Sequence, residues 1–186
     1  MLFSLFTGDA RTTAISILLT LPTILIALSA HEAAHGYIAY KLGDRTAFNL
    51  GRITLNPFKH LDPIGALFML VFGYGWAKPV PINARNFKDP RKGMALTALA
   101  GPVTNLLLGT VGVILYYLTL NIANTNAVLT MVSDNYTAYV AISMILVFLH
   151  NFAFLNFLYT VFNLIPVPPF DGSRIFYVFL PPKYYF

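Results

Sequence analysis

The stretch Ser29-Ala-His-Glu-Ala-Ala-His-Gly-Tyr37 places two histidines and the only glutamate of the chain inside a long apolar segment. His31 and His35 are four residues apart, so on an α-helix both imidazoles project from one face, with Glu32 beside them. This spacing is the H-E-x-x-H pattern, in which two imidazoles bind zinc and the glutamate acts as a general base. The stretch therefore predicts a helix that carries most of a hydrolytic metal site.

The sequence around this stretch has the composition of a membrane protein. Of the 186 residues, 57% are hydrophobic and 10% are charged, whereas about a quarter of the residues in soluble domains are charged. Three runs lack charged residues and are long enough to span a bilayer as a helix, which takes roughly 20 residues (range about 17–25): 12–30, 93–133 and 135–170, with His150 counted as neutral. A fourth run, 63–77, is shorter and contains three glycines, which favours a re-entrant or interfacial segment.

These runs predict the fold class of an α-helical polytopic membrane protein, organised as one domain over residues 1–186. We expect three long transmembrane helices, near 12–42, 93–123 and 136–162, with Pro22 as the site of a kink in the first. Two strand-like pieces, 46–57 and 76–83, are broken by Gly, Asn and Pro and predict a small β element at the membrane surface. The N-terminus lacks a basic region and a cleavage site before the H-E-x-x-H stretch, so we expect the first span to be retained.

The positive charges predict an orientation. Lys and Arg gather in segments 41–60 and 78–92, while the loop 124–135 contains neither. By the positive-inside rule both basic segments are cytoplasmic, so the short run between them enters and leaves on one side. Asp171 then arrives on the same side as the H-E-x-x-H stretch, and we expect a multi-pass protein of the cell membrane with its site toward the cytoplasm. The formal charge of +5 is explained by this topology, so we do not expect nucleic-acid binding.

The chain has no cysteine, so the third zinc ligand must be a histidine or a carboxylate. Asp9 and Asp134 are predicted on the far side, and Asp44 and Asp89 in exposed basic loops. Four candidates remain: Asp171, Asp62, His60 and His150. The prolines before Asp171 break a helix at membrane depth, where irregular backbone is tolerated only inside protein or along a wet cavity. Asp-Gly is equally a common turn dipeptide, so spacing alone leaves the choice open.

Three motifs together show a resemblance to a known family. H-E-A-A-H-G lies in one predicted membrane helix, A-G-P-V-T-N (Ala100 to Asn105) lies in a later one, and N-L-I-P-V-P-P-F-D-G (Asn163 to Gly172) follows the last. The chain resembles the site-2 protease family of intramembrane zinc metalloproteases, and is most similar to its small members without PDZ or CBS domains. The likeness covers essentially the whole chain; Phe170 stands where many members have leucine.

The resemblance implies a zinc endopeptidase that cleaves transmembrane segments of membrane proteins, in regulated proteolysis or in clearance of signal peptides and membrane stubs. It implies that His31, His35 and Asp171 bind one zinc ion and that Glu32 is the catalytic base. The developing oxyanion needs a further donor, for which Asn163 is the candidate; capping of the helix end is the equally supported alternative. A substrate helix must unwind locally before attack, and an extended piece could add as a strand beside 76–83.

Two other functions were weighed against a protease. A metal transporter would use the same ligands as a transit site, and a noncatalytic scaffold would close its zinc site with a fourth protein ligand. His60, His150 and Asp62 are expected to be structural more often than ligating, and Asn105 to bond between helices. The substrate and the oligomeric state cannot be predicted from the sequence. The chain ends at P-P-K-Y-Y-F, Pro181 to Phe186, where a small family member would often continue into another helix, so the sequence leaves a C-terminal truncation open.

Overall fold

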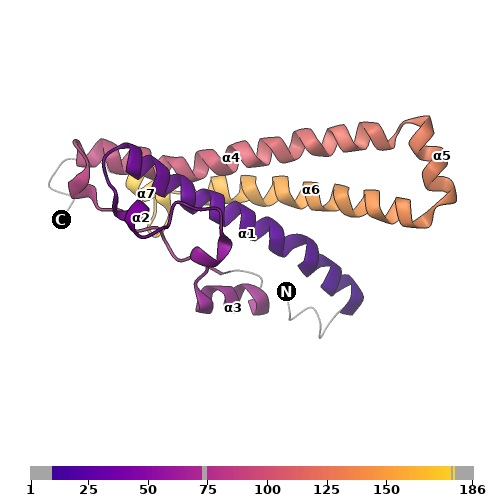
Figure 1. Ribbon diagram of the computed structural model, residues 1–186, viewed down its shortest axis with the longest axis horizontal. Helices are drawn as coiled ribbons and strands as arrows, with labels where there is room; N and C mark the ends of the chain where they lie inside the picture. The colour runs from indigo at the N-terminus through magenta and orange to yellow at the C-terminus, as the bar shows by residue number, and fades with distance from the viewer. Residues whose placement is uncertain (1–9, 73–74, 177, 179–186) are drawn as a thin grey trace.

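The computed structural model describes residues 10–72, 75–176 and 178, and helices make up most of it (Figure 1). The three long helices are α1 (Ala10–Lys41), α4 (Pro90–Ala123) and α6 (Tyr136–Asn163). Each is long and apolar enough to cross a membrane. These helices confirm the three predicted spans. The expectations for the N-terminal stretch before Ala10 and for Pro181–Phe186 lie outside the described residues.

The long helices bring distant parts of the chain to one end of the molecule. α4 and α6 run side by side and are joined at one end by α5 (Asn126–Asp134), a helix within the segment expected to be a loop (Figure 1). α1 packs against both near the opposite end and diverges from them toward its own N-terminus. The short helix α7 (Asp171–Phe176) contacts α4 at that same end. The C-terminal half of α1 therefore meets α7 against the start of α4.

The predicted small β element is wrong. In residues 10–72, 75–176 and 178, the β pairing consists of one isolated antiparallel bridge between Leu61 and Ala77. The two strand-like pieces instead contain or lead into α2 (Thr46–Asn49), the 3-10 turns η2 (Pro57–Lys59) and η3 (Ala84–Asn86), and irregular backbone; α3 (Pro63–Phe72) lies between them.

Side chains that bond to the nearby backbone explain this difference. Asn56 Oδ1 accepts a hydrogen bond from the Phe58 N–H at 3.1 Å, and Asn83 Oδ1 accepts one from the Arg85 N–H at 3.1 Å. Such local bonds offer the backbone an alternative to a strand ladder. The prolines in both pieces also lack the N–H that a ladder needs.

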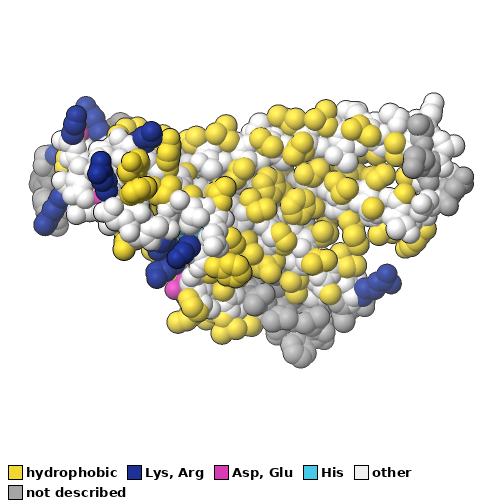
Figure 2. Space-filling view, in the orientation of Figure 1, with side chains coloured by type: hydrophobic (Ala, Val, Ile, Leu, Met, Phe, Trp, Pro, Cys, Tyr) yellow, Lys and Arg dark blue, Asp and Glu magenta, His cyan; other side chains and the backbone are white. Residues whose placement is uncertain are grey.

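The long helices have an apolar exterior and bury several polar side chains between them. Thr23, Thr97, Asn105 and Asn156 are fully buried, whereas large apolar side chains along α4 are exposed, including Ile114 at 53%, Leu118 at 53% and Ile122 at 63%. Figure 2 shows Lys and Arg gathered at the end that carries α2 and α7, and apolar side chains along α4 and α6 toward α5. Lipid tails suit such an apolar exterior, and small or polar residues are typical of contacts between membrane helices.

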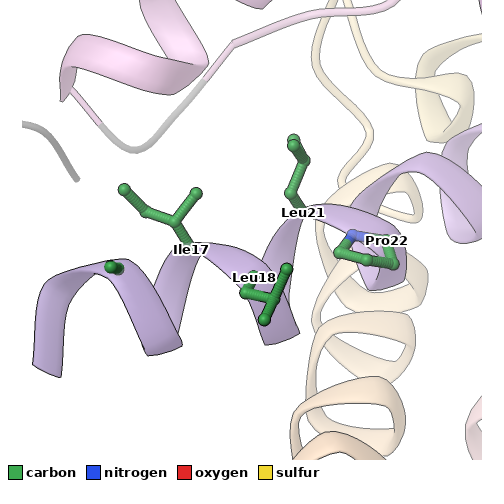
Figure 3. A pocket seen from close by; sticks show the side chains of 5 residues that line it. Ile17, Leu18, Leu21 and Pro22 are labelled. Atoms are coloured by element: carbon green, nitrogen blue, oxygen red, sulfur yellow. The ribbon is translucent and has the colours of Figure 1, made fainter. Parts of the chain in front are cut away.

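Pro22 lies inside α1, as its position in the predicted span required. It forms one wall of an apolar hollow of about 350 Å³ whose other lining residues are Ala14, Ile17, Leu18 and Leu21 (Figure 3). No titratable side chain lines this hollow. The chemistry suggested by the sequence must therefore lie elsewhere on α1, nearer its C-terminal end.

Candidate metal centre

His31, His35 and Asp171 meet although 136 residues separate the last two. The Nε2 atoms of the histidines are 3.0 Å apart, and Asp171 Oδ2 lies 3.0 Å from His31 Nε2 and 3.1 Å from His35 Nε2. His31 and His35 are 5% exposed and Asp171 is 9% exposed. Among the described residues this is the group of three or more His, Asp or Glu side chains that could hold a metal ion.

Hydrogen bonds at the other ring nitrogens set the tautomers of both histidines. His35 Nδ1 lies 2.7 Å from the Thr97 carbonyl oxygen, and His31 Nδ1 contacts Asn105 Oδ1. A carbonyl oxygen can only accept, so each Nδ1 carries the proton and each neutral ring presents a lone pair at Nε2. Metal-binding histidines commonly donate their second ring N–H in this way.

The three donor atoms are arranged as zinc ligands would be. The two Nε2 atoms and a carboxylate oxygen lie about 3 Å from one another, an arrangement that a cation at their centre would satisfy. Two ligands that each lie about 2.0–2.1 Å from a tetrahedral zinc are roughly 3.3 Å apart. Three protein ligands also leave the open position typical of a catalytic zinc.

Gly101 of α4 keeps the space beside these nitrogens open. A Cβ atom at this position would lie 2.5 Å from His31 Nε2 and 2.6 Å from His35 Nε2. Gly101 belongs to the A-G-P-V-T-N motif, and Thr97 and Asn105, which hold the two rings, lie one turn to either side of it on the same helix. This face of α4 therefore forms the wall of the centre.

Glu32 lies beside the metal centre and is held there by a backbone hydrogen bond from Val80. Its Oε2 accepts a hydrogen bond of 2.7 Å from the Val80 N–H. Val80 lies between Pro79 and Pro81, neither of which has an N–H, so this is the one backbone donor of the three residues. The bond fixes one carboxylate oxygen and leaves Oε1 for a water or substrate proton.

The other candidates for the third ligand have different partners. His60 is buried and its Nε2–H donates to the Thr54 carbonyl at 2.8 Å. Asp62 Oδ1 accepts from the backbone N–H groups of Ile64 and Gly65, at the start of α3. His150 is exposed on α6, with its ring 6.2 Å from that of Tyr116. None of the three belongs to the group at Asp171.

Asn163 is half-buried at the end of α6, and its amide nitrogen donates to the Tyr159 carbonyl at 3.0 Å. This contact fits the helix-end alternative, although an amide nitrogen has a second N–H. The structure does not place Asn163 among the contacts of the three-residue group, so its role as an oxyanion donor stays a prediction.

Comparisons with known proteins agree with this geometry. The family model for Peptidase family M50 matches residues 19–182. The chain belongs to peptidase family M50. The chain is 43% identical over 160 residues to "Putative zinc metalloprotease YwhC" of Bacillus subtilis, which covers 86% of this chain and 68% of that protein. It is 30% identical over 156 residues to "Putative zinc metalloprotease Rip2" of Mycolicibacterium smegmatis, covering 80% of this chain and 52% of that protein. No solved structure matches the chain.

As a member of peptidase family M50, the chain is a zinc metalloprotease, and His31, His35 and Asp171 could hold one zinc ion. Sequence reasoning found these three residues and Glu32. It singled out Asn105 only as a residue that bonds between helices, which is confirmed, and it gave Thr97, Gly101 and Val80 no role in the site. The A-G-P-V-T-N motif carried the signal for Gly101 and Asn105, whereas a backbone donor such as that of Val80 leaves no trace in side-chain identity.

Proposed function

We propose that the protein is an intramembrane endopeptidase that hydrolyses peptide bonds in or near transmembrane segments of membrane proteins. The proposal rests on one observation: His31 and His35 lie on α1, a helix long and apolar enough to cross a bilayer, and the short helix α7 brings Asp171 to them. His31 is ten residues from the end of α1 at Lys41, or about 15 Å along the helix, which is half of a hydrocarbon core of about 30 Å.

The proposed roles follow from what each side chain can do. Bound zinc supplies a Lewis acid that acidifies water and polarises a peptide carbonyl. His31, His35 and Asp171 hold the ion, and Glu32 accepts a proton at Oε1 and later passes it to the leaving amine. The bond from Val80 to Oε2 keeps the carboxylate oriented during both transfers. Asn163 is proposed as the donor to the oxyanion through its second N–H.

The proposed orientation places the basic segments, and with them the centre, toward the cytoplasm. Lys and Arg are concentrated at the end of the molecule that carries α2 and α7, which is the end where the three-residue group lies (Figure 2). In the cell membrane, this arrangement would admit substrates laterally from the lipid and water from the cytoplasmic side. The proposed partners are therefore transmembrane protein substrates and the surrounding bilayer.

Two substitutions test the function and the ligand assignment separately. Glu32→Gln should retain zinc and lose cleavage of a reporter that carries a transmembrane segment, by roughly a hundredfold or more, as expected for removal of a general base. An active Glu32→Gln protein would refute the mechanism. Asp171→Asn should lose zinc, measured by mass spectrometry of the purified protein. Asp62→Asn removes another carboxylate of the original candidate set and should keep zinc.

A further inference from the structure

Two asparagines form the polar centre of the helix bundle behind the metal site. Asn105 lies on α4 and Asn156 on α6, and both are fully buried. Asn105 Nδ2 donates to Asn156 Oδ1 at 3.0 Å and to the Ala27 carbonyl of α1 at 3.3 Å. Asn105 Oδ1 contacts His31 Nδ1. One amide thus joins all three long helices and ends on a proposed zinc ligand.

The hydrogen-bonding capacity of these groups permits one arrangement of protons. Asn156 Nδ2 lies 2.8 Å from the Phe152 carbonyl, which can only accept, so the Asn156 oxygen must face Asn105. Asn105 then presents its NH₂ group to that oxygen and to the Ala27 carbonyl, and its own oxygen to His31. Turning either amide over would set two oxygens against each other in a buried site, which costs about 1–3 kcal/mol for each unsatisfied group.

We propose that Asn105, oriented by Asn156 and the Ala27 carbonyl, is a positioning residue that holds His31 as the Nδ1–H tautomer with its Nε2 lone pair toward the zinc. This inference rests on the proposed function, because it takes His31 as a ligand. The inference requires that Asn105 present its oxygen, an acceptor, to His31. If Asn105 presented its NH₂ group instead, the hydrogen bonds that link it through Asn156 to the Phe152 carbonyl would break.

The second histidine provides an internal comparison. His35 Nδ1 is held by the backbone carbonyl of Thr97, which no side-chain substitution removes. His31 depends on a side chain for the same bond. Substitution at Asn105 therefore perturbs one ligand of the group and leaves the orientation of the other in place.

Zinc affinity, measured by chelator competition on the full chain in detergent, tests the inference without any activity assay. Asn105→Leu should bind zinc 10- to 100-fold more weakly than the wild type, the usual cost of removing such a partner of a ligand. Asn156→Leu removes a buried amide of the same size but leaves the Ala27 bond to orient Asn105, so its affinity should fall only a few-fold.

Thermal unfolding of the zinc-free proteins separates positioning from packing. If Asn105→Leu and Asn156→Leu lose equal zinc affinity, or if Asn105→Leu binds as tightly as the wild type, the inference is refuted. A thermal stability of Asn105→Leu far below that of Asn156→Leu would show that its loss of zinc affinity reflects lost packing, and would also refute the inference. If the wild type itself binds no zinc, the proposed function fails; if the wild type binds zinc and Asp171→Asn does not, only the role of Asn105 is in question.

Discussion

At the scale of single residues, the geometry of the metal centre depends on the absence of a side chain at Gly101 as well as on the three proposed ligands. His31 and His35 approach α4 so closely that a methyl group at position 101 would overlap both rings. Histidines this close to a helix backbone can be held by carbonyl and amide oxygens of that helix, as Thr97 and Asn105 hold them. The absence of a side chain at Gly101 is thus a requirement of the metal geometry.

Gly101→Ala should therefore weaken zinc binding while leaving the bundle folded. The added Cβ would lie 2.5–2.6 Å from the two Nε2 atoms, and overpacking of this kind costs about 1–3 kcal/mol, or roughly a tenfold to hundredfold change in affinity. Gly109→Ala is the matched control, since a Cβ there would meet the ring of Phe157 on α6 at 3.0 Å, far from the ligands along α4. Zinc content and thermal stability measured together check the prediction; wild-type zinc affinity in Gly101→Ala would contradict it.

Asp44 shows a second residue-scale effect, and it corrects an expectation. The sequence placed Asp44 in an exposed loop, but it is fully buried. It accepts hydrogen bonds from the backbone and hydroxyl of Thr46, from the Asn83 N–H at 2.7 Å and from Asn86 Nδ2 at 2.7 Å. Burial tends to raise the pKa of the Asp44 carboxyl, but these bonds outweigh burial and lower it below its usual value.

The lowered pKa of Asp44 determines how the stability that this carboxylate contributes changes with pH. Since the carboxylate is favoured in the folded state, its stabilisation is present above the ordinary aspartate pKa of about 3.9 and is lost as pH falls below that value. Asp44→Asn should lower the free energy of unfolding at pH 7 by about 1–3 kcal/mol, and the difference from the wild type should shrink below pH 4. Thermal unfolding at pH 7 and pH 3 measures both; a difference that grows toward pH 3 would contradict the assignment.

The residues that sequence reasoning identified share one property: their chemistry is carried by side-chain type and spacing. His31, Glu32 and His35 follow from a helical period, whereas spacing leaves Asp171 as one of four candidates and the resemblance selects it. The structure separates Asp171 from Asp62 and His60 by where each donor atom is engaged, which depends on long-range folding. Burial of Asp44 was missed for the same reason, because its partners lie about 40 residues away.

At the scale of elements, the segment 78–83 acts as a strap across the C-terminal half of α1. The Lys78 N–H donates to the His60 carbonyl at 2.7 Å, and Arg52 donates to the Lys78 carbonyl at 2.7 Å. The Val80 N–H binds Glu32 and the Asn83 N–H binds Asp44. The addition of a substrate strand beside this strap stays a prediction.

The strap should matter for catalysis through one N–H group. Val80→Pro removes the donor to Glu32, whereas Val80→Ala shortens the same buried side chain and keeps it. A hydrogen bond to a charged group contributes about 1.5–3 kcal/mol, so Val80→Pro should lower kcat roughly 10- to 100-fold relative to Val80→Ala. Zinc content should be the same in both proteins. Equal kcat values in the two variants would show that the Val80 bond does not orient the base.

The sequence predicted the helices whose formation depends on the length of an apolar run. It failed for segments whose conformation depends on hydrogen bonds between polar side chains and the nearby backbone. The long helices follow from apolar runs that only a helix can carry across a bilayer. The 46–57 and 76–83 pieces alternate as strands do, yet Asn56, Asn83 and the prolines turn the backbone instead. Helix α5 formed within a polar segment whose composition predicted a loop.

At the scale of the whole molecule, polar side chains such as Thr97, Asn105 and Asn156 are fully buried between the long helices, while large apolar side chains face outward along α4. This arrangement would let histidines and carboxylates function at membrane depth, as proposed, because the bundle supplies the partners that lipid lacks. It also constrains α3, since ten residues of helix extend only about 15 Å against a core of about 30 Å. We therefore expect the segments on either side of α3 to lie on one side of the membrane.

The topology can be tested cleanly because the chain has no cysteine. Lys59 precedes α3, Lys88 follows it, and Asn124 ends α4; all three are exposed. By the positive-inside rule, single variants Lys59→Cys and Lys88→Cys should react with a membrane-impermeant maleimide only in inside-out vesicles, and Asn124→Cys only in intact cells. Labelling of Lys59→Cys and Lys88→Cys from opposite sides would mean that α3 crosses the bilayer. Reversal of all three would keep the fold but turn the metal centre toward the outside, which would change the compartment that supplies its water.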